Sequence, residues 1–335
     1  MSGRPNAELP DFARNGVNLA SGGLGAVGVT ASDQFFAPLD RMLSDAPAVF
    51  YPDRYDDHGK WMDGWETRRR RDGGQDWAIV KLAAPGHIHG FDIDTAHFTG
   101  NYPPACRIDA CMTAHTPDDR TDWHEILPVS PLGPSAHHYY ACSSHQAWSH
   151  IRITILPDGG VARLKVYGRP QLDPGAAGGE IDLAAALNGA RVVAVSDAHY
   201  GDYHRILFPG RGVDMGDGWE TRRRREPGND WAIIKLATRG TVRRAVVDTA
   251  NFKGNYPHSC ALVAADLTGF QDNLDDAVVT SAMFWKPLLD KQKLSPDSIH
   301  EFAAQLADCG PITHVMLNIY PDGGVSRLKL FGHPA

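Results

Sequence analysis

The sequence predicts an all-β protein made of two tandem β-sandwich domains of jelly-roll form. Two observations lead to this prediction. The second half of the chain repeats the first half, and most patterned segments are short, strand-like stretches separated by turns rich in Pro and Gly. The length of 335 residues also exceeds what a single hydrophobic core usually supports, which favours two domains.

The duplication is clearest in three blocks that keep one register. The octapeptide GWETRRRR begins at residue 64 and again at residue 218, and 218 minus 64 gives a spacing of 154. At this same spacing, two further blocks return with few changes: DWAIVKLA as DWAIIKLA, and DTAHFTGNYPP as DTANFKGNYPH. We therefore expect domains at 11–168 and 181–333, with a linker rich in Gly and Pro at 169–180.

An insertion is the main difference between the copies. The first copy has about ten more residues between Leu43 and Gly64 than the second has between Leu207 and Gly218. The additional segment includes DRYDDHGKWM, which carries several titratable side chains. It is interpreted either as part of a reactive site or as an oligomer contact.

The individual elements are predicted from periodicity. Alternation in DWAIVKLA and DWAIIKLA predicts equivalent central strands with Trp77 and Trp231 largely buried. The run HIRITIL, PDGG, VARLKVYG predicts a hairpin, on which Arg163 and Lys165 are interpreted as solvated charges. A helix is expected at 295–306, where Ser precedes Pro and apolar residues follow at helical spacing.

Composition excludes several classes of protein. Acidic residues outnumber basic ones, 40 to 33, so the arginine runs do not belong to a generally basic surface and nucleic acid is not expected as a partner. No apolar run is long enough to span a membrane, and the polar N-terminus lacks the layout of a secretory signal, so we expect a cytoplasmic protein. The five cysteines form no CxxC pair and are expected to be reduced thiols.

The repeated octapeptide carries the first candidate site. On a strand, Glu66 shares one face with Arg68 and Arg70, so we expect one arginine to pair with Glu66 and the other to bind an anion. The second copy repeats this face with Glu220 and Arg222. The alternative is structural, since charged side chains on an edge strand also discourage aggregation.

The block DTAHFTGNYP adds loop residues to this candidate site. Asn101 and Tyr102 follow a strand end, where ligand-binding groups often collect, although turn chemistry alone also accounts for Asn101. His97 becomes Asn251 in the second copy, and an imidazole here could carry a proton near neutral pH. The histidines lack a tight metal-ligand spacing, so no cofactor is indicated and a divalent metal is neither required nor excluded.

Taken in order and doubled, these motifs closely resemble the allantoicases, enzymes of purine catabolism that hydrolyse allantoate to ureidoglycolate and urea. The resemblance covers residues 11–168 and 180–332 and rests on GWETRRRR, DWAIVKLA, DTAHFTGNYPP and PDGGVARLKVYG together with their second copies. It implies two jelly rolls of the galactose-binding-like type, a homo-oligomer, and allantoate as the small-molecule substrate.

The chemistry of this reaction suggests roles for the candidate residues. Arginine side chains can bind the carboxylate of the substrate, and amide and phenol side chains can form hydrogen bonds with its ureido groups. Cleavage of the C–N bond needs a base and an acid. Glu66 or Asp63 is expected to be the base, and His97 or Lys60 the acid. The expected substrate-binding residues are Arg68, Arg70, Asn101, Tyr102, Glu220, Arg222 and Asn255.

The sequence also allows two other interpretations. The same type of sandwich also serves as a carbohydrate-binding module, which release of urea from allantoate would exclude. One copy could also act only as a scaffold. We expect the first copy to be catalytic, because it alone has His97 and the titratable side chains of the insertion.

Overall fold

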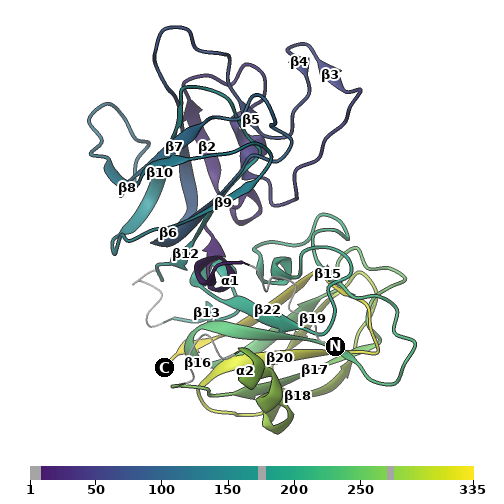
Figure 1. The fold of residues 1–335 in the computed structure, drawn as a ribbon. Coiled ribbons are helices and arrows are strands. Elements are labelled where there is room, and N and C mark those ends of the chain that lie inside the picture. Colours follow the sequence, from purple (N-terminus) through teal and green to yellow (C-terminus); the bar gives the residue numbers. More distant parts are fainter. Residues whose placement is uncertain (1–8, 173–178, 270–274) are drawn as a thin grey trace. The chain divides into compact units, whose positions relative to one another are not determined.

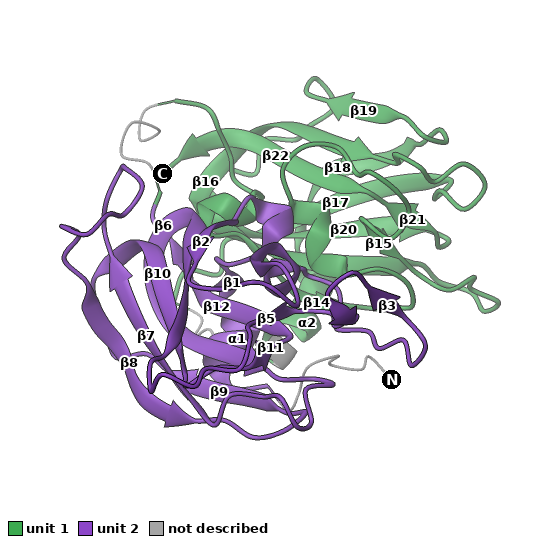
Figure 2. Ribbon diagram, turned by 90° about the horizontal axis from the view of Figure 1, so that it is seen from above, with its two compact units in different colours: residues 1–8, 172–335 green, residues 9–171 purple. Residues whose placement is uncertain are grey.

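The computed structural model describes residues 9–172, 179–269 and 275–335. The chain divides into an N-terminal unit, Leu9–Gln171, and a C-terminal unit that begins at Leu172 and ends at Ala335 (Figure 2). In the described residues the regular structure is nearly all strand (Figure 1), which confirms the predicted fold class. Of the expected linker at 169–180, residues 173–178 lie outside the described residues, and Arg169 and Pro170 still belong to a strand.

The N-terminal unit contains one α-helix, two 3₁₀ helices and the strands β1 to β12 among its described residues. Their bounds are α1 Asp11–Asn15, β1 Val17–Asn18, η1 Gly22–Leu24, β2 Val27–Ala31, η2 Leu39–Leu43, β3 Tyr55–Asp56, β4 Gly59–Lys60, β5 Trp65–Glu66, β6 Asp76–Asp94, β7 Ala105–Cys111, β8 His124–Pro131, β9 His137–Ala141, β10 Ala147–Leu156, β11 Gly160–Val161 and β12 Arg163–Pro170.

Among the described residues, the C-terminal unit repeats the strand order without counterparts of β3 and β4, and α2 and η6 are added before its β18 strand. Its elements are β13 Ile181–Asp182, η4 Ala186–Asn188, β14 Arg191–Val195, η5 Tyr203–Leu207, β15 Trp219–Glu220, β16 Asp230–Asp248, β17 Ser259–Ala265, α2 Asp275–Ser281, η6 Ala282–Phe284, β18 Lys286–Lys293, β19 Ile299–Phe302, β20 Ile312–Tyr320, β21 Gly324–Val325 and β22 Arg327–Pro334.

One long strand organises each unit. The first half of β6 pairs with β2 and β10, and the order continues through β7 to β8. Its second half pairs with β12 and β9. The long strand thus belongs to both layers of the sandwich. The C-terminal unit uses β16 in the same way, with β14 and β20 on the first half and β22 and β19 on the second.

The burial pattern of β6 explains the change of layer. Ala78, Val80 and Leu82 face the core in the first half, whereas Phe91 and Ile93 face it in the second. Side chains alternate along a strand, so this switch from even to odd positions needs an irregularity between the halves. Ile88 still faces the core at an even position, and the register of β12 on β6 shifts directly after it, between Ile88 and Gly90.

The predicted central strands are confirmed, and Trp77 and Trp231 on them have intermediate burial. DWAIVKLA and DWAIIKLA begin β6 and β16, and each pairs on both sides. Trp77 and Trp231 are only half-buried, because they alternate with the residues that face the core. The fully buried tryptophans are Trp65 and Trp219 of the octapeptides.

Two further expectations are corrected. The run around PDGG is not a hairpin, since β10 pairs with β6 and β7 whereas β12 pairs with β6 and β1, so the turn carries the chain between layers. The segment 295–306 is not the expected helix but contains the strand β19, Ile299–Phe302, which pairs with β16. Asp297 has a φ of 45° and Ile299 is exposed, so tertiary pairing overrides the apolar spacing.

The structure also locates the insertion. The backbone N–H of Val49 donates to the Asp63 carboxylate, and that of Val213 donates to Asp217. These contacts correspond in the two units, so the additional residues lie between Val49 and Asp63, where β3 and β4 form a small hairpin (Figure 1). Among the described residues, no helix has the length and apolarity needed to cross a membrane.

Candidate functional site

The octapeptide GWETRRRR is held at the end of the N-terminal sandwich by short backbone pairings. Glu66 pairs with Gly160 of β11 on one side and with Ala37 on the other. Trp65 is fully buried and donates from its indole N–H to the Asp33 carbonyl at 2.9 Å. This anchoring fixes the backbone from which the Glu66 side chain projects.

The Glu66 carboxylate meets Asn101. The Asn101 amide donates to Glu66 Oε1 at 2.6 Å, and only 8% of Glu66 is exposed. Burial raises the pKa of Glu66 because the charged form is desolvated, while the hydrogen bond from Asn101 lowers the pKa in part. A carboxylate of this kind can exchange a proton closer to neutral pH than an exposed one.

The PDGG turn places Asn101. Gly160 N–H donates to the Asn101 carbonyl at 2.8 Å, and a Cβ added at Gly159 would lie 2.7 Å from that carbonyl oxygen. Gly159 also has a φ of 141°, which favours glycine. The backbone N–H of Gly159 in turn donates to the Thr67 hydroxyl at 3.2 Å, so the turn joins the octapeptide to the Asn101 loop.

The expected pairing of Glu66 with an arginine is wrong. The strand β5 ends at Glu66, so the alternation of faces does not continue through the arginines. Arg68 instead pairs with Asp33 at 3.0 Å, and Arg70 pairs with Asp72 and Asp76. Within the described part of the chain, the Glu66 side chain has no ion pair with an arginine.

The C-terminal unit builds the same pair with one difference. Asn255 donates to Glu220 Oε1, and Arg222 is again bound by an aspartate, Asp197. Here the Asn255 amide also lies 3.8 Å from the sulfur of Met215, and Glu220 is less buried than Glu66. The two sites therefore share their polar pair but not their surroundings.

Comparisons with known proteins agree with the duplication of the chain. A family model described as the allantoicase repeat matches residues 17–171 and again residues 181–335. The chain belongs to the allantoicase family. A protein named "Probable allantoicase" from Rhizobium meliloti (strain 1021) is 60% identical over 334 residues, which are 99% of this chain and 98% of that protein. "Probable allantoicase 2" from Burkholderia pseudomallei (strain K96243) is 57% identical over 334 residues, with the same coverage.

A solved structure also matches over both units. The crystal structure of allantoicase from Saccharomyces cerevisiae has a TM-score of 0.81 and 34% sequence identity, and the match covers 95% of this chain and 93% of that one. The doubled β-sandwich is thus the architecture of this family, as the sequence motifs imply.

Asp63, one of the two bases expected for an allantoicase, is bound in an ion pair. Its carboxylate accepts from Arg163 at 2.7 Å, and only 3% of the Arg163 side chain is exposed. The interpretation of Arg163 as a solvated charge is therefore wrong. Asp217 and Arg327 form the same buried pair at 2.8 Å in the C-terminal unit. Repetition in both units indicates a structural role for this pair.

The two expected acids do not meet Glu66 either. Lys60, on β4 of the inserted hairpin, donates to the Pro52 carbonyl and lies 4.7 Å from the centre of the Tyr55 ring. His97 has a φ of 69° and its Nε2 lies 3.2 Å from the Ala48 carbonyl. Within the described residues, neither side chain has a hydrogen bond or ion pair with Glu66.

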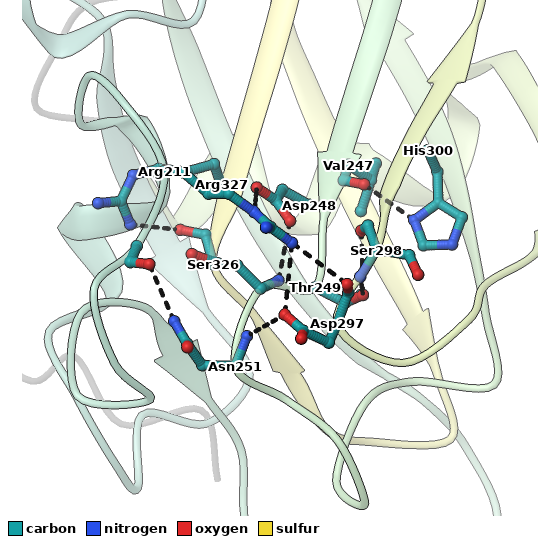
Figure 3. A network of polar contacts seen from close by, with 12 residues as sticks. Arg211, Val247, Asp248, Thr249, Asn251, Asp297, Ser298, His300, Ser326 and Arg327 are labelled. Carbon is teal, nitrogen blue, oxygen red and sulfur yellow. Dashed lines mark hydrogen bonds and ion pairs between the residues drawn. The ribbon is translucent and has the colours of Figure 1, made fainter.

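Asn251, the counterpart of His97 in the C-terminal unit, indicates a structural role for this position. Asn251 has nearly the same φ, 68°, and its amide donates to the Gly212 carbonyl at 2.9 Å (Figure 3). Its backbone N–H donates to Asp297, which also binds Arg211. In both units this residue tethers a loop, a task that an imidazole and an amide perform equally well.

Tyr102 and a possible metal site are the remaining candidates from the sequence. Tyr102 is half-buried and packs beside Met62, Phe98 and Ala162. Among the described residues, no group of three or more His, Cys, Asp and Glu side chains is arranged to hold a metal ion. The repetition of PDGG in both copies is the sequence signal that this turn supports the site.

Proposed function

We propose that this protein hydrolyses allantoate to ureidoglycolate and urea, and that Glu66 with Asn101 in the N-terminal unit forms the reacting centre. Membership of the allantoicase family supports the reaction. The observation that carries the site is the buried Glu66 carboxylate with its raised pKa and the amide of Asn101 directed at it.

The reaction needs two proton transfers. A C–N bond at the central carbon of allantoate breaks, the departing urea nitrogen gains a proton, and the oxygen of water bonds to the carbon and loses a proton. Glu66 in its ionised form accepts the proton from water and then supplies it to the urea nitrogen. A pKa raised by burial suits both transfers, because the group is neither a very weak base nor a very weak acid at neutral pH.

Asn101 suits the ureido group of the substrate. One N–H of its amide is directed at Glu66, and its other N–H and its carbonyl can meet the C=O and N–H of a ureido group. Tyr102, the next residue, adds a phenol close to the same loop. This arrangement would place the scissile nitrogen beside the Glu66 carboxyl group.

Arg68 is the better of the two candidates for the substrate carboxylate. Its side chain is 65% exposed although Asp33 holds it, whereas Arg70 is bound by two aspartates and is 29% exposed. A guanidinium that is fixed in orientation but still accessible can bind a second carboxylate through its remaining N–H groups.

We assign catalysis to the N-terminal unit. Glu66 is buried there, while Glu220 is only partly buried, and Met215 lies against the Asn255 amide in the place where a ureido group would bind. Glu220, Arg222 and Asn255 remain a weaker binding site in this proposal. The inserted hairpin also belongs to the N-terminal unit alone.

The alternative of a carbohydrate-binding module has less support. Sugar-binding modules stack exposed aromatic rings on pyranose rings, but the tryptophans of both octapeptides, Trp65 and Trp219, are fully buried. Incubation of the purified chain with allantoate separates the two functions. Stoichiometric release of urea and ureidoglycolate supports the proposal, and binding of sugars without any urea release overturns it.

The proposal extends to the setting of the protein. All five cysteines are free thiols, which a reducing compartment such as the cytoplasm preserves. Burial raises the pKa of Cys106 and of Cys260 to about 12, so both thiols stay protonated and unreactive. A homo-oligomer is proposed on the resemblance to the family.

A further inference from the structure

The N-terminal unit has a hairpin that the C-terminal unit lacks. It occupies residues 50–62 between Val49 and Asp63, whereas residues 214–216 alone separate Val213 from Asp217. Its strands β3 and β4 pair through Tyr55 with Lys60 and through Asp56 with Gly59. Most of its side chains are exposed, so hydrophobic burial does not account for its presence.

The base of the hairpin is fixed to the sandwich. Trp61 is buried, with the guanidinium of Arg54 at 4.2 Å and that of Arg41 at 5.0 Å from its ring. Arg41 also donates to the Met62 carbonyl at 2.9 Å. On the same side, Phe50 stacks on His97 with 5.6 Å between the ring centres. These contacts anchor the base next to the loop that carries Asn101.

The tip of the hairpin has one aromatic contact. His58 stacks on Phe35 with ring centres 4.6 Å apart and an angle of 22° between the rings. Phe35 is 42% exposed, and the guanidinium of Arg68 lies 5.3 Å from the centre of its ring. The tip therefore rests beside the arginine proposed to bind the substrate carboxylate.

The two anchors, the stack of His58 on Phe35 and the stack of Phe50 on His97, are connected to the Glu66 site through different segments. Phe35 is two residues before Ala37, whose backbone pairs with that of Glu66, and Arg68 follows Glu66 by two residues. His97, at the other anchor, precedes Asn101 by four residues in the loop between β6 and β7. A hairpin fixed at both places extends from the Asn101 side of the site to the Arg68 side.

We propose that Phe35 and His58 are positioning residues for the reaction, because their stacked rings hold the hairpin over Glu66 and Asn101 and so retain the small ureide substrate. This inference rests on the proposed function. The stack works through ring contact and not through proton transfer, so a flat aromatic ring at position 58 is sufficient.

The test compares the steady-state kinetics of allantoate hydrolysis in His58→Ala, Phe35→Ala and His58→Phe with those of the wild type. We expect both alanine variants to raise KM about tenfold, the range that one aromatic stacking contact supplies, with much less change in kcat. His58→Phe should restore the wild-type KM. The matched control is His199→Ala, in the corresponding loop of the C-terminal unit, where no hairpin lies, and its KM should equal that of the wild type.

A second measurement does not depend on activity. Trypsin cleavage after Arg54 in the hairpin should be severalfold faster in His58→Ala than in the wild type, and allantoate should slow cleavage in the wild type. Equal KM values and equal cleavage rates in wild type and His58→Ala would overturn the role of the stack. A His58→Phe variant as impaired as His58→Ala would also overturn it, since the imidazole itself would then be needed. Absence of urea release by the wild type would instead overturn the proposed function.

Discussion

The Asn101 amide donates a 2.6 Å hydrogen bond to the carboxylate of Glu66, although 35 residues separate them in the sequence. Asn255 and Glu220 make the same contact at the same separation in the C-terminal unit. The same substitution can therefore be made in both units of one chain. The variant in the N-terminal unit tests catalysis, and the variant in the C-terminal unit is its structural control.

Glu66→Gln should lower kcat for allantoate by about 10²- to 10⁴-fold, because the amide cannot accept a proton from water. Glu220→Gln should leave kcat nearly unchanged. Urea release measured on both variants at saturating substrate decides between the units. Equal losses in the two variants would contradict the assignment of catalysis to the N-terminal unit.

A loss of stability is not expected to explain a lower kcat of Glu66→Gln. Burial raises the pKa of Glu66, so folding favours its protonated form, and the stability that this form contributes is lost as the pH rises through the raised pKa. An uncharged glutamine avoids this loss. Glu66→Gln should therefore unfold at no lower a temperature than the wild type at neutral pH.

Asn101→Ala should shift the pH dependence of kcat/KM. The hydrogen bond from Asn101 lowers the pKa of Glu66, so its removal raises this pKa further. Glu66 must be ionised to act as a base, and activity is lost as the pH falls through its pKa, so the acid limb should move to higher pH. Asn255→Ala is the control and should not move the limb. A shift to lower pH in Asn101→Ala would show that Glu66 is not the titrating base.

Gly159→Ala should impair both stability and catalysis. The residue has a φ of 141°, and its added Cβ would lie 2.7 Å from the Asn101 carbonyl oxygen, so the loop that carries Asn101 must shift. Gly323→Ala creates the same contact with Asn255 in the C-terminal unit. Both variants should lose about 1–2 kcal/mol or more of unfolding free energy. Only Gly159→Ala should lower kcat/KM at a temperature where both are folded, and equal activity in the two would contradict the positioning role of this turn.

Asp63→Ala should destabilise the protein without removing the reacting carboxylate. It leaves the buried Arg163 guanidinium without its carboxylate partner, which costs about 3–5 kcal/mol of unfolding free energy. Asp217→Ala should cost a similar amount through Arg327. Chemical denaturation measures both effects, and the double variant Asp63→Ala with Arg163→Met should recover part of the loss. A stable Asp63→Ala variant without activity would restore Asp63 as a base.

The sequence by itself determined the doubled all-β fold and the central strands. Both follow from local information, namely a repeat with a constant register and the alternation of side chains along DWAIVKLA and DWAIIKLA. The candidates Glu66, Asn101, Glu220 and Asn255 also came from repeated motifs, and the structure brings them together in pairs.

Tertiary structure decided which groups are partners. The strand ends at Glu66, so Arg68 and Arg70 do not share its face. Arg68 pairs with Asp33 and Arg70 with Asp76, and the Glu66 carboxylate accepts a hydrogen bond from Asn101. Likewise, β10 and β12 pair mainly with different halves of β6, so the PDGG turn connects two layers. The local sequence pattern alone predicts a hairpin there. Local periodicity states which face a side chain takes on a continuing strand. It does not state where the strand ends or which distant carboxylate or amide packs beside it, because those depend on contacts between residues far apart in the chain.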